Sequence, residues 1–331
     1  MVTSFFYDIL VLYLTMEKQR GTYISIVRFV VFCALALMVL LSSCTSSKQL
    51  IYVETDLYEL IIPEKHKEFL VLFPSFGGTI ESVKKGSKLV EKALDVNIAV
   101  VIVKLNQDLF LNEEEQAEIG QVLLNVLIDN SGVEKDIYIG GFSSGGNLAM
   151  QTAKYLTNNQ KVNLSIKGLL IVDSPLDLVQ FYHNSKKLIL KNNAKEAQCF
   201  IDYLDDRLGE MNSNLENYKL FSPCVNSIGY VENSKFKNTE LVFYTEPASV
   251  FKKKNYQQDF KDTNSFQLQQ LSEKLNALHY KVSYIETENK GYRDEDEGVH
   301  VPHSWSIIDV DAIMRWIKNK EMPLSNVLLL D

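Results

Sequence analysis

Cysteine is scarce in this chain, which has 331 residues and only four cysteines. A small fold stapled by disulfides is therefore excluded. Basic residues are fewer than acidic ones, 34 against 42, and the formal net charge is −8. This balance argues against nucleic acid as the main partner, because phosphate binding requires clustered Lys and Arg. The Cys and His spacing of a zinc site is also missing, and we predict neither a metal nor a cofactor.

Apolar residues are plentiful, and one apolar run lies near the N-terminus. Hydrophobic residues make up 46% of the chain, which is enough for a sizeable core. Lys18 and Arg20 precede the run Ile24–Leu41, and Ser42-Ser43-Cys44 follows it. A positive, then apolar, then small-residue order is typical of a secretory signal. Small residues directly before a cysteine resemble the bacterial lipobox, in which the cysteine is lipidated and becomes the new N-terminus.

This resemblance implies a lipoprotein signal peptide over residues 1–43 and a lipid on Cys44. The mature protein would be exported and anchored to the membrane of a bacterial cell envelope. Met16 opens the charged part of the signal, so residues 1–15 are interpreted as a mis-called start. An uncleaved membrane anchor is the alternative, since the run is near the lower length limit for spanning a bilayer.

The mature chain, residues 44–331, alternates between strand-like and helix-like segments. Expected strands cover 52–62, 68–73, 97–105, 136–140, 166–172, 240–244 and 281–285, and expected helices cover 83–94, 113–127, 147–156, 265–278 and 306–318. Several strand segments are almost wholly apolar, which suits strands buried on both faces of a sheet. The pattern predicts a single α/β domain with a mostly parallel sheet and helices on both faces. Residues 175–238 break the alternation and are expected to form a helical insertion over the carboxyl edge, where ligands bind.

The most informative motif is Gly141-Phe-Ser-Ser-Gly145, a G-x-S-x-G sequence between a strand and a helix. A serine on such a sharp turn has a strained backbone, so residues two positions away must be small. The segment Gly141–Ala149 is similar to the G-D-S-A-G-G-N-L-A elbow of hormone-sensitive-lipase-like esterases. This resemblance implies an α/β-hydrolase fold and a Ser–acid–His hydrolase, with Ser143 as the nucleophile.

A serine nucleophile needs a base, and in this fold the base follows the acid along the chain. That order eliminates His66, while His183 lies in the insertion and His279 lies far from the carboxyl edge of the sheet. His300 and His303 remain, both after the last strand and before the last helix. We favour His303, because His-Ser-Trp directly before a helix resembles the final motif of the family.

The acid is expected after the strand 240–244, which places Glu246 first. Asp262 is the second choice, and Asp173, after the strand 166–172, is the third. The oxyanion hole needs backbone N–H groups aimed at the developing charge. We expect them from Ser144 and from Phe76, in a loop where Pro74 and Ser75 replace the usual His and Gly of the family.

These features together predict a serine esterase that acts on small-molecule esters through Ser143, His303 and Glu246. Two alternatives stay open: a lipid-anchored binding protein on a hydrolase fold, and a small peptidase of the prolyl-oligopeptidase kind. The export signal also permits a disulfide between Cys199 and Cys224, and buried free thiols are the competing interpretation.

Overall fold

We describe a computed structural model of the protein. The structure describes residues 49–105, 107–131, 135–158, 164–225, 230–231, 236–292 and 298–326. The predicted signal peptide, including Cys44, lies outside the described residues. Within the described ranges, each helix is too short or too polar to cross a bilayer.

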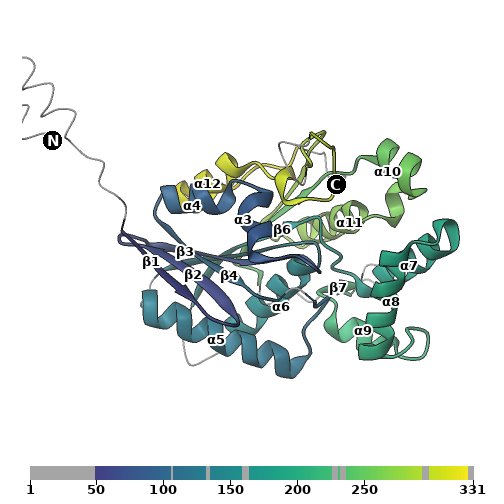
Figure 1. Ribbon diagram of the computed structural model, residues 1–331, viewed down its shortest axis with the longest axis horizontal. Helices are drawn as coiled ribbons and strands as arrows, with labels where there is room; N and C mark the ends of the chain where they lie inside the picture. Colours follow the sequence, from purple (N-terminus) through teal and green to yellow (C-terminus); the bar gives the residue numbers. More distant parts are fainter. Residues whose placement is uncertain are drawn as a thin grey trace, which may run out of the picture. The chain divides into compact units, whose positions relative to one another are not determined.

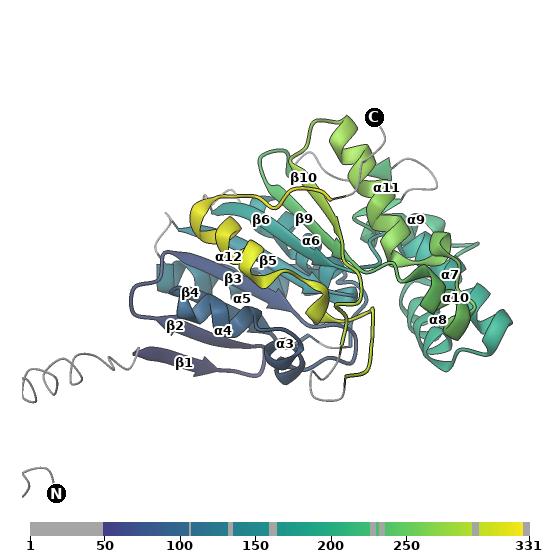
Figure 2. The same ribbon diagram turned by 90° about the horizontal axis from the view of Figure 1, so that it is seen from above.

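An eight-stranded sheet forms the centre of the molecule (Figures 1 and 2). Its spatial order is β1-β2-β4-β3-β5-β6-β9-β10. The strands are β1 (Leu50–Glu54), β2 (Tyr58–Pro63), β3 (Glu68–Phe73), β4 (Ile98–Val103), β5 (Asp136–Phe142), β6 (Ser165–Val172), β9 (Glu240–Thr245) and β10 (Val282–Glu286). The β1–β2 and β2–β4 pairs are antiparallel, and the other neighbours are parallel. The predicted mostly parallel sheet is confirmed.

Helices cover both faces of this sheet, as Figure 2 shows. They are α3 (Ile80–Gly86), α4 (Leu89–Asp95), α5 (Glu113–Ser131), α6 (Ser144–Asn158), α11 (Asn264–Ala277) and α12 (Val310–Asn319). Side chains from α5, α6 and α11 pack on one face, and those from α3, α4 and α12 pack on the other. The residues of β3 and β4 are all buried, because both faces of these strands are covered. This explains their unbroken apolar sequences.

A second group of helices lies beyond one end of the sheet (Figure 1). Between β6 and β9 the chain forms α7 (Leu178–Asn192), α8 (Lys195–Leu208), α9 (Leu215–Phe221) and the short pair β7 (Cys224–Val225) and β8 (Tyr230–Val231), and α10 (Ser249–Tyr256) follows β9. The helices α7, α8 and α9 share an apolar cluster that includes Ile201, Leu204 and Tyr218. Cys199 is exposed and Cys224 is buried, and both are free thiols.

Candidate active site

The turn between β5 and α6 holds Ser143 in a strained conformation. Its φ is 55°, a left-handed value that few residues other than glycine adopt. Its N–H donates to the carbonyl of Val172 on the neighbouring strand at 2.9 Å. A Cβ on Gly141 would lie 2.0 Å from the carbonyl oxygen of Gly145. The turn is therefore too tight for a side chain at that position, which is the constraint that the sequence motif implied.

His303 lies directly against this serine. The Oγ of Ser143 and the Nε2 of His303 are 3.0 Å apart, which is hydrogen-bond distance. His303 follows β10 and precedes a short 3-10 helix, Trp305–Ile307. Its ring packs on Phe142, the residue before the serine, with 4.6 Å between the ring centroids. The structure therefore brings together the serine and the histidine that the sequence analysis favoured.

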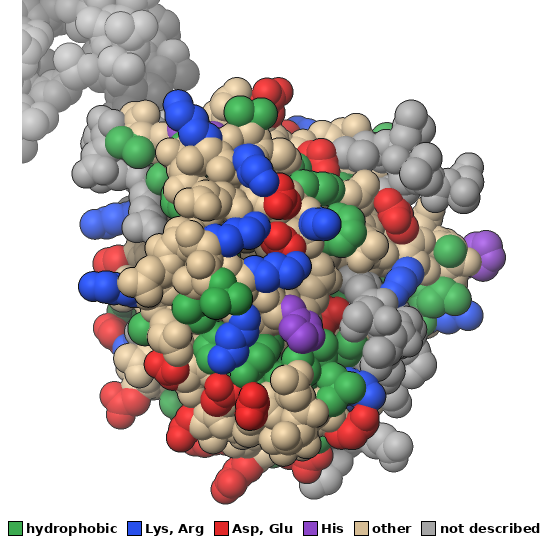
Figure 3. Space-filling model, turned by 90° about the vertical axis from the view of Figure 1, so that its right-hand side faces the viewer, with side chains coloured by type: hydrophobic (Ala, Val, Ile, Leu, Met, Phe, Trp, Pro, Cys, Tyr) green, Lys and Arg blue, Asp and Glu red, His purple; other side chains and the backbone are tan. Residues whose placement is uncertain are grey.

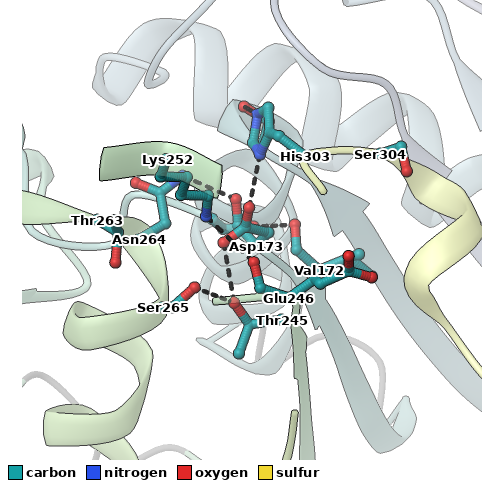
Figure 4. A network of polar contacts seen from close by, with 12 residues as sticks. Val172, Asp173, Thr245, Glu246, Lys252, Thr263, Asn264, Ser265, His303 and Ser304 are labelled. Atoms are coloured by element: carbon teal, nitrogen blue, oxygen red, sulfur yellow. Dashed lines mark hydrogen bonds and ion pairs between the residues drawn. The ribbon is translucent and has the colours of Figure 1, made fainter. Parts of the chain in front are cut away.

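Asp173 completes the chain of contacts. The Nδ1–H of His303 donates to Oδ2 of Asp173 at 2.7 Å, and the aspartate side chain is only 1% exposed. Thr245 Oγ1 donates to the other carboxylate oxygen at 3.1 Å. Asn264 Nδ2 donates to the Asp173 carbonyl at 2.9 Å. Figure 4 shows these side chains converging on the aspartate, which is thus fixed on several sides.

Asp173 remains ionised despite its burial. Burial by itself would raise the pKa of the carboxyl group, since it disfavours the charged form. The ammonium of Lys252 and the contacts with His303 and Thr245 outweigh burial, so the pKa lies below its ordinary value of 3.8. Lys252 is itself buried, and its Nζ donates to the carbonyl of Glu246 at 3.1 Å.

Glu246, the expected acid, does not contact His303. Its Oε2 accepts the N–H of Lys290 at 2.9 Å and that of Gly291 at 3.0 Å. Its Oε1 accepts Nε2–H from His300, the alternative base. Asp173 follows β6, the direct neighbour of the strand that leads to Ser143. The strand that leads to Glu246 lies one position further away.

Asp262, the second choice for the acid, is held elsewhere. It lies in a 3-10 turn, Phe260–Asp262, and its side chain is buried. Its Oδ1 accepts a hydrogen bond from Lys187 on α7 at 2.8 Å. Asp262 thus joins two surface segments. Asp173, the third choice for the acid, occupies the position beside His303. Ser174 and Pro175, which follow Asp173, are typical of an ordinary turn, so the local sequence does not mark this aspartate as the acid.

The two expected oxyanion donors lie on segments that pack closely together. Ser144 is the first residue of α6, so its N–H has no partner within the helix. Phe76 lies in the loop after β3, where Gly78 N–H donates to the Ser75 carbonyl at 2.8 Å. A Cβ on Gly145 would lie 2.4 Å from the carbonyl oxygens of Phe73 and Pro74. The start of α6 is therefore in close contact with the end of β3.

The aromatic residues of the helical group divide into two sets. Tyr182 and Tyr218 are buried within it and form part of its core. Phe200 and Tyr203 on α8 are only partly buried, and both contact the ring of Phe76, at centroid distances of 5.4 Å and 5.9 Å. The predicted oxyanion loop thus reaches α8 through an aromatic contact.

The surface over these helices is rich in lysine. The helices α7 and α10 contain no acidic residue, and besides the buried Lys252 they contain the lysines Lys186, Lys187, Lys191, Lys253 and Lys254. Figure 3 shows basic side chains gathered on this side of the molecule, with apolar side chains among them. No group of three or more His, Cys, Asp or Glu side chains in the described part of the chain could hold a metal ion.

Comparison with known proteins identifies the fold. Neither a family model nor a curated protein matches the sequence. Among solved structures, a hyperthermophilic esterase from the archaeon Pyrobaculum calidifontis has a TM-score of 0.52 at 14% identity, over 95% of this chain and 98% of that one. Carboxyl esterase 2 from the mycorrhizal fungus Tuber melanosporum has a TM-score of 0.51 at 14% identity, over 85% of each chain. At this identity the likeness concerns the fold, and the protein has the α/β-hydrolase fold.

Proposed function

We propose that the protein is a serine hydrolase that cleaves carboxylic esters through Ser143, His303 and Asp173. One observation carries this proposal: the continuous chain of contacts from the serine Oγ to the imidazole at 3.0 Å and from the imidazole to a buried carboxylate at 2.7 Å. The left-handed backbone of Ser143 supports the proposal, because strained backbone conformations are concentrated at functional residues. The fold shared with esterases agrees with an ester as the substrate.

The geometry supports a two-step reaction. The Oγ of Ser143 attacks the carbonyl carbon of the ester while Nε2 of His303 takes its proton. The tetrahedral oxyanion accepts hydrogen bonds from the N–H groups of Ser144 and Phe76. Collapse expels the alcohol, which receives the proton from the imidazolium, and leaves an acyl group on the serine. Water, deprotonated by His303, then releases the acid and restores the enzyme.

Asp173 has two roles in this proposal. Its carboxylate accepts Nδ1–H, which leaves Nε2 of the imidazole free to take the serine proton. Its negative charge then stabilises the imidazolium that forms. The low pKa of the carboxyl group keeps that charge in place, since the group is ionised well below neutral pH.

Labelling with a fluorophosphonate tests this function directly, because the reagent reacts with an activated serine. We expect a single adduct on Ser143 and hydrolysis of p-nitrophenyl acetate by the unmodified protein. Ser143→Ala should abolish both while leaving thermal unfolding unchanged. Ser272→Ala, which removes a buried hydroxyl on α11, is the matched control. A protein that neither reacts with the reagent nor hydrolyses esters would instead be a binding protein on a hydrolase fold.

We also propose that the chain is exported and anchored to an envelope membrane by a lipid on Cys44. Support comes from the order of the sequence, in which positive residues, an apolar run and Ser42-Ser43 precede the cysteine. Cys44→Ala should leave an unprocessed precursor that carries no lipid. Mass spectrometry of the membrane fraction tests this, and a mature protein without an acyl mass on residue 44 would contradict it.

A further inference from the structure

The loop that carries His303 is built from two chain segments that lie side by side. Tyr292 and His300 form an antiparallel bridge between them. The N–H of Val301 donates to the carbonyl of Gly291 at 2.8 Å. A Cβ on Gly291 would lie only 2.2 Å from the Val301 carbonyl oxygen, so the two segments are too close for a side chain at this position. Displacement of one segment would therefore displace the other.

The carboxylate of Glu246 binds both segments of this loop. Oε2 accepts the backbone N–H groups of Lys290 and Gly291 on the first segment. Oε1 accepts Nε2–H of His300 on the second. The Glu246 side chain is 1% exposed, so its carboxylate is largely shielded from water. Hydrogen bonds to an ionised carboxylate are stronger than those between neutral groups.

We propose that Glu246 is a positioning residue for His303, which stands three residues beyond His300. This inference rests on the proposed function, since it assigns a role within the same site. Glu246 cannot serve as the acid in this arrangement, because both nitrogens of the His303 ring are already occupied, Nδ1 by Asp173 and Nε2 by Ser143. Glu246 instead fixes the loop from which the imidazole of His303 projects.

Neighbouring elements fix Glu246 and His300 in turn. Lys252 donates from α10 to the Glu246 carbonyl at 3.1 Å. The ring of Phe251, the preceding residue, packs against His300 with 5.2 Å between the centroids. The site thus uses two adjacent carboxylates at the ends of neighbouring strands, β6 and β9. Asp173 binds the imidazole itself, and Glu246 binds the loop behind it.

The test compares Glu246→Gln with Glu286→Gln, which alters a glutamate at the end of the next strand, β10. Glu246→Gln keeps the size of the side chain but removes its charge and places an amide NH₂ against N–H donors. We expect kcat for p-nitrophenyl acetate to fall about 10²-fold with little change in KM, the cost of a base displaced by about 1 Å. Glu286→Gln should leave kcat unchanged. His300→Ala, which removes one of the three contacts, provides a milder variant if Glu246→Gln fails to fold.

A second readout follows the position of His303 without relying on turnover. The Nδ1 proton that His303 shares with Asp173 gives a low-field resonance in the proton NMR spectrum, and ¹⁵N labelling of histidine distinguishes this Nδ1–H from the Nε2–H that His300 shares with Glu246. We expect Asp173→Asn to abolish this resonance, and Glu246→Gln and His300→Ala to broaden or shift it. This signal remains measurable even if the unmodified protein hydrolyses no ester, so failure of the proposed function and failure of the positioning role are distinguishable.

Two results would overturn the positioning role. The first is an unchanged kcat and an unchanged resonance in both Glu246→Gln and His300→Ala, which would show that the loop holds His303 without the carboxylate. The second is a resonance that disappears in Glu246→Gln and persists in Asp173→Asn. That result would make Glu246 the direct partner of the imidazole, as the sequence analysis expected.

Discussion

The Nδ1 atom of His303 lies 2.7 Å from Oδ2 of Asp173, although 130 residues separate the two along the chain. The aspartate follows β6, the strand beside the one that leads to Ser143. Its backbone is left-handed, with φ of 41°, a conformation in which aspartate is tolerated better than most residues. Its N–H donates to the Tyr244 carbonyl at 2.8 Å, which holds the turn in place. This relationship defines the acid of the proposed triad.

Asp173→Asn should therefore remove most of the activity. The amide cannot stabilise an imidazolium, and it favours the wrong tautomer of His303, so we expect kcat to fall by about 10⁴. Asp262→Asn is the matched control, because this buried aspartate contacts lysines on α7 instead of the site. Steady-state kinetics with p-nitrophenyl acetate measures both variants. An inactive Asp262→Asn beside an active Asp173→Asn would reverse the assignment.

Gly145→Ala should impair both stability and catalysis. The added Cβ would lie 2.4 Å from the carbonyl oxygens of Phe73 and Pro74, so backbone must move. We expect a loss of about 1–3 kcal/mol in the free energy of unfolding, as for other overpacked sites. Movement of the loop should also displace the Phe76 N–H, at a cost of about 10²–10³ in kcat. Urea unfolding and single-turnover kinetics measure the two effects separately, and normal values for both would contradict the close packing.

The low pKa of Asp173 predicts a loss of stability in acid. The folded protein binds this proton less readily than the unfolded chain, so the ionised group stabilises the fold at pH values above its ordinary pKa of 3.8. That contribution disappears as the pH falls from 3.8 through the lower folded-state pKa. Asp173→Asn lacks it at every pH. The difference in unfolding free energy between the two proteins should therefore shrink in strong acid, and a difference independent of pH would contradict the prediction.

The two free cysteines should differ in reactivity. Burial raises the pKa of the Cys224 thiol well above 9.0, so the reactive thiolate is suppressed. Cys199 is exposed on α8. Iodoacetamide should modify Cys199 in the native protein and Cys224 only after unfolding, as peptide mass spectrometry will show. Recovery of a peptide in which the two are joined by a disulfide would contradict the free thiols of the structure.

Burial of Cys224 also has a consequence at alkaline pH. The unfolded thiol ionises near its ordinary pKa of 9.0, whereas the folded thiol stays protonated to higher pH. The unfolded chain is therefore favoured as the pH rises above 9.0, and the fold loses stability. Cys224→Ala removes this dependence. Urea unfolding at several alkaline pH values should show a flatter decline for the variant, and equal slopes would contradict the prediction.

Local sequence determined much of this site. The apolar segments that became β3, β4 and β5 predict buried parallel strands, because only such strands are apolar on both faces. The glycines around Ser143 predict the sharp turn, because a tight backbone leaves no room for a Cβ. The position of His303 after the last strand follows from chain order. These features depend on residues that are close together in the chain, so the amino-acid sequence alone is enough to predict them.

The choice between Asp173 and Glu246 required the tertiary structure. Each residue follows a parallel strand, and the two strands end at the same edge of the sheet, so the sequence pattern places both carboxylates near the last loop and ranks Glu246 above Asp173. The contacts of His303 with Asp173 and of His300 with Glu246 depend on how residues 300–303 pack against the ends of β6 and β9. Strand order and loop packing depend on contacts between residues far apart in the chain. The sequence by itself determined which aspartate, glutamate and histidines were candidates for the site. Those long-range contacts decided which carboxylate pairs with which histidine.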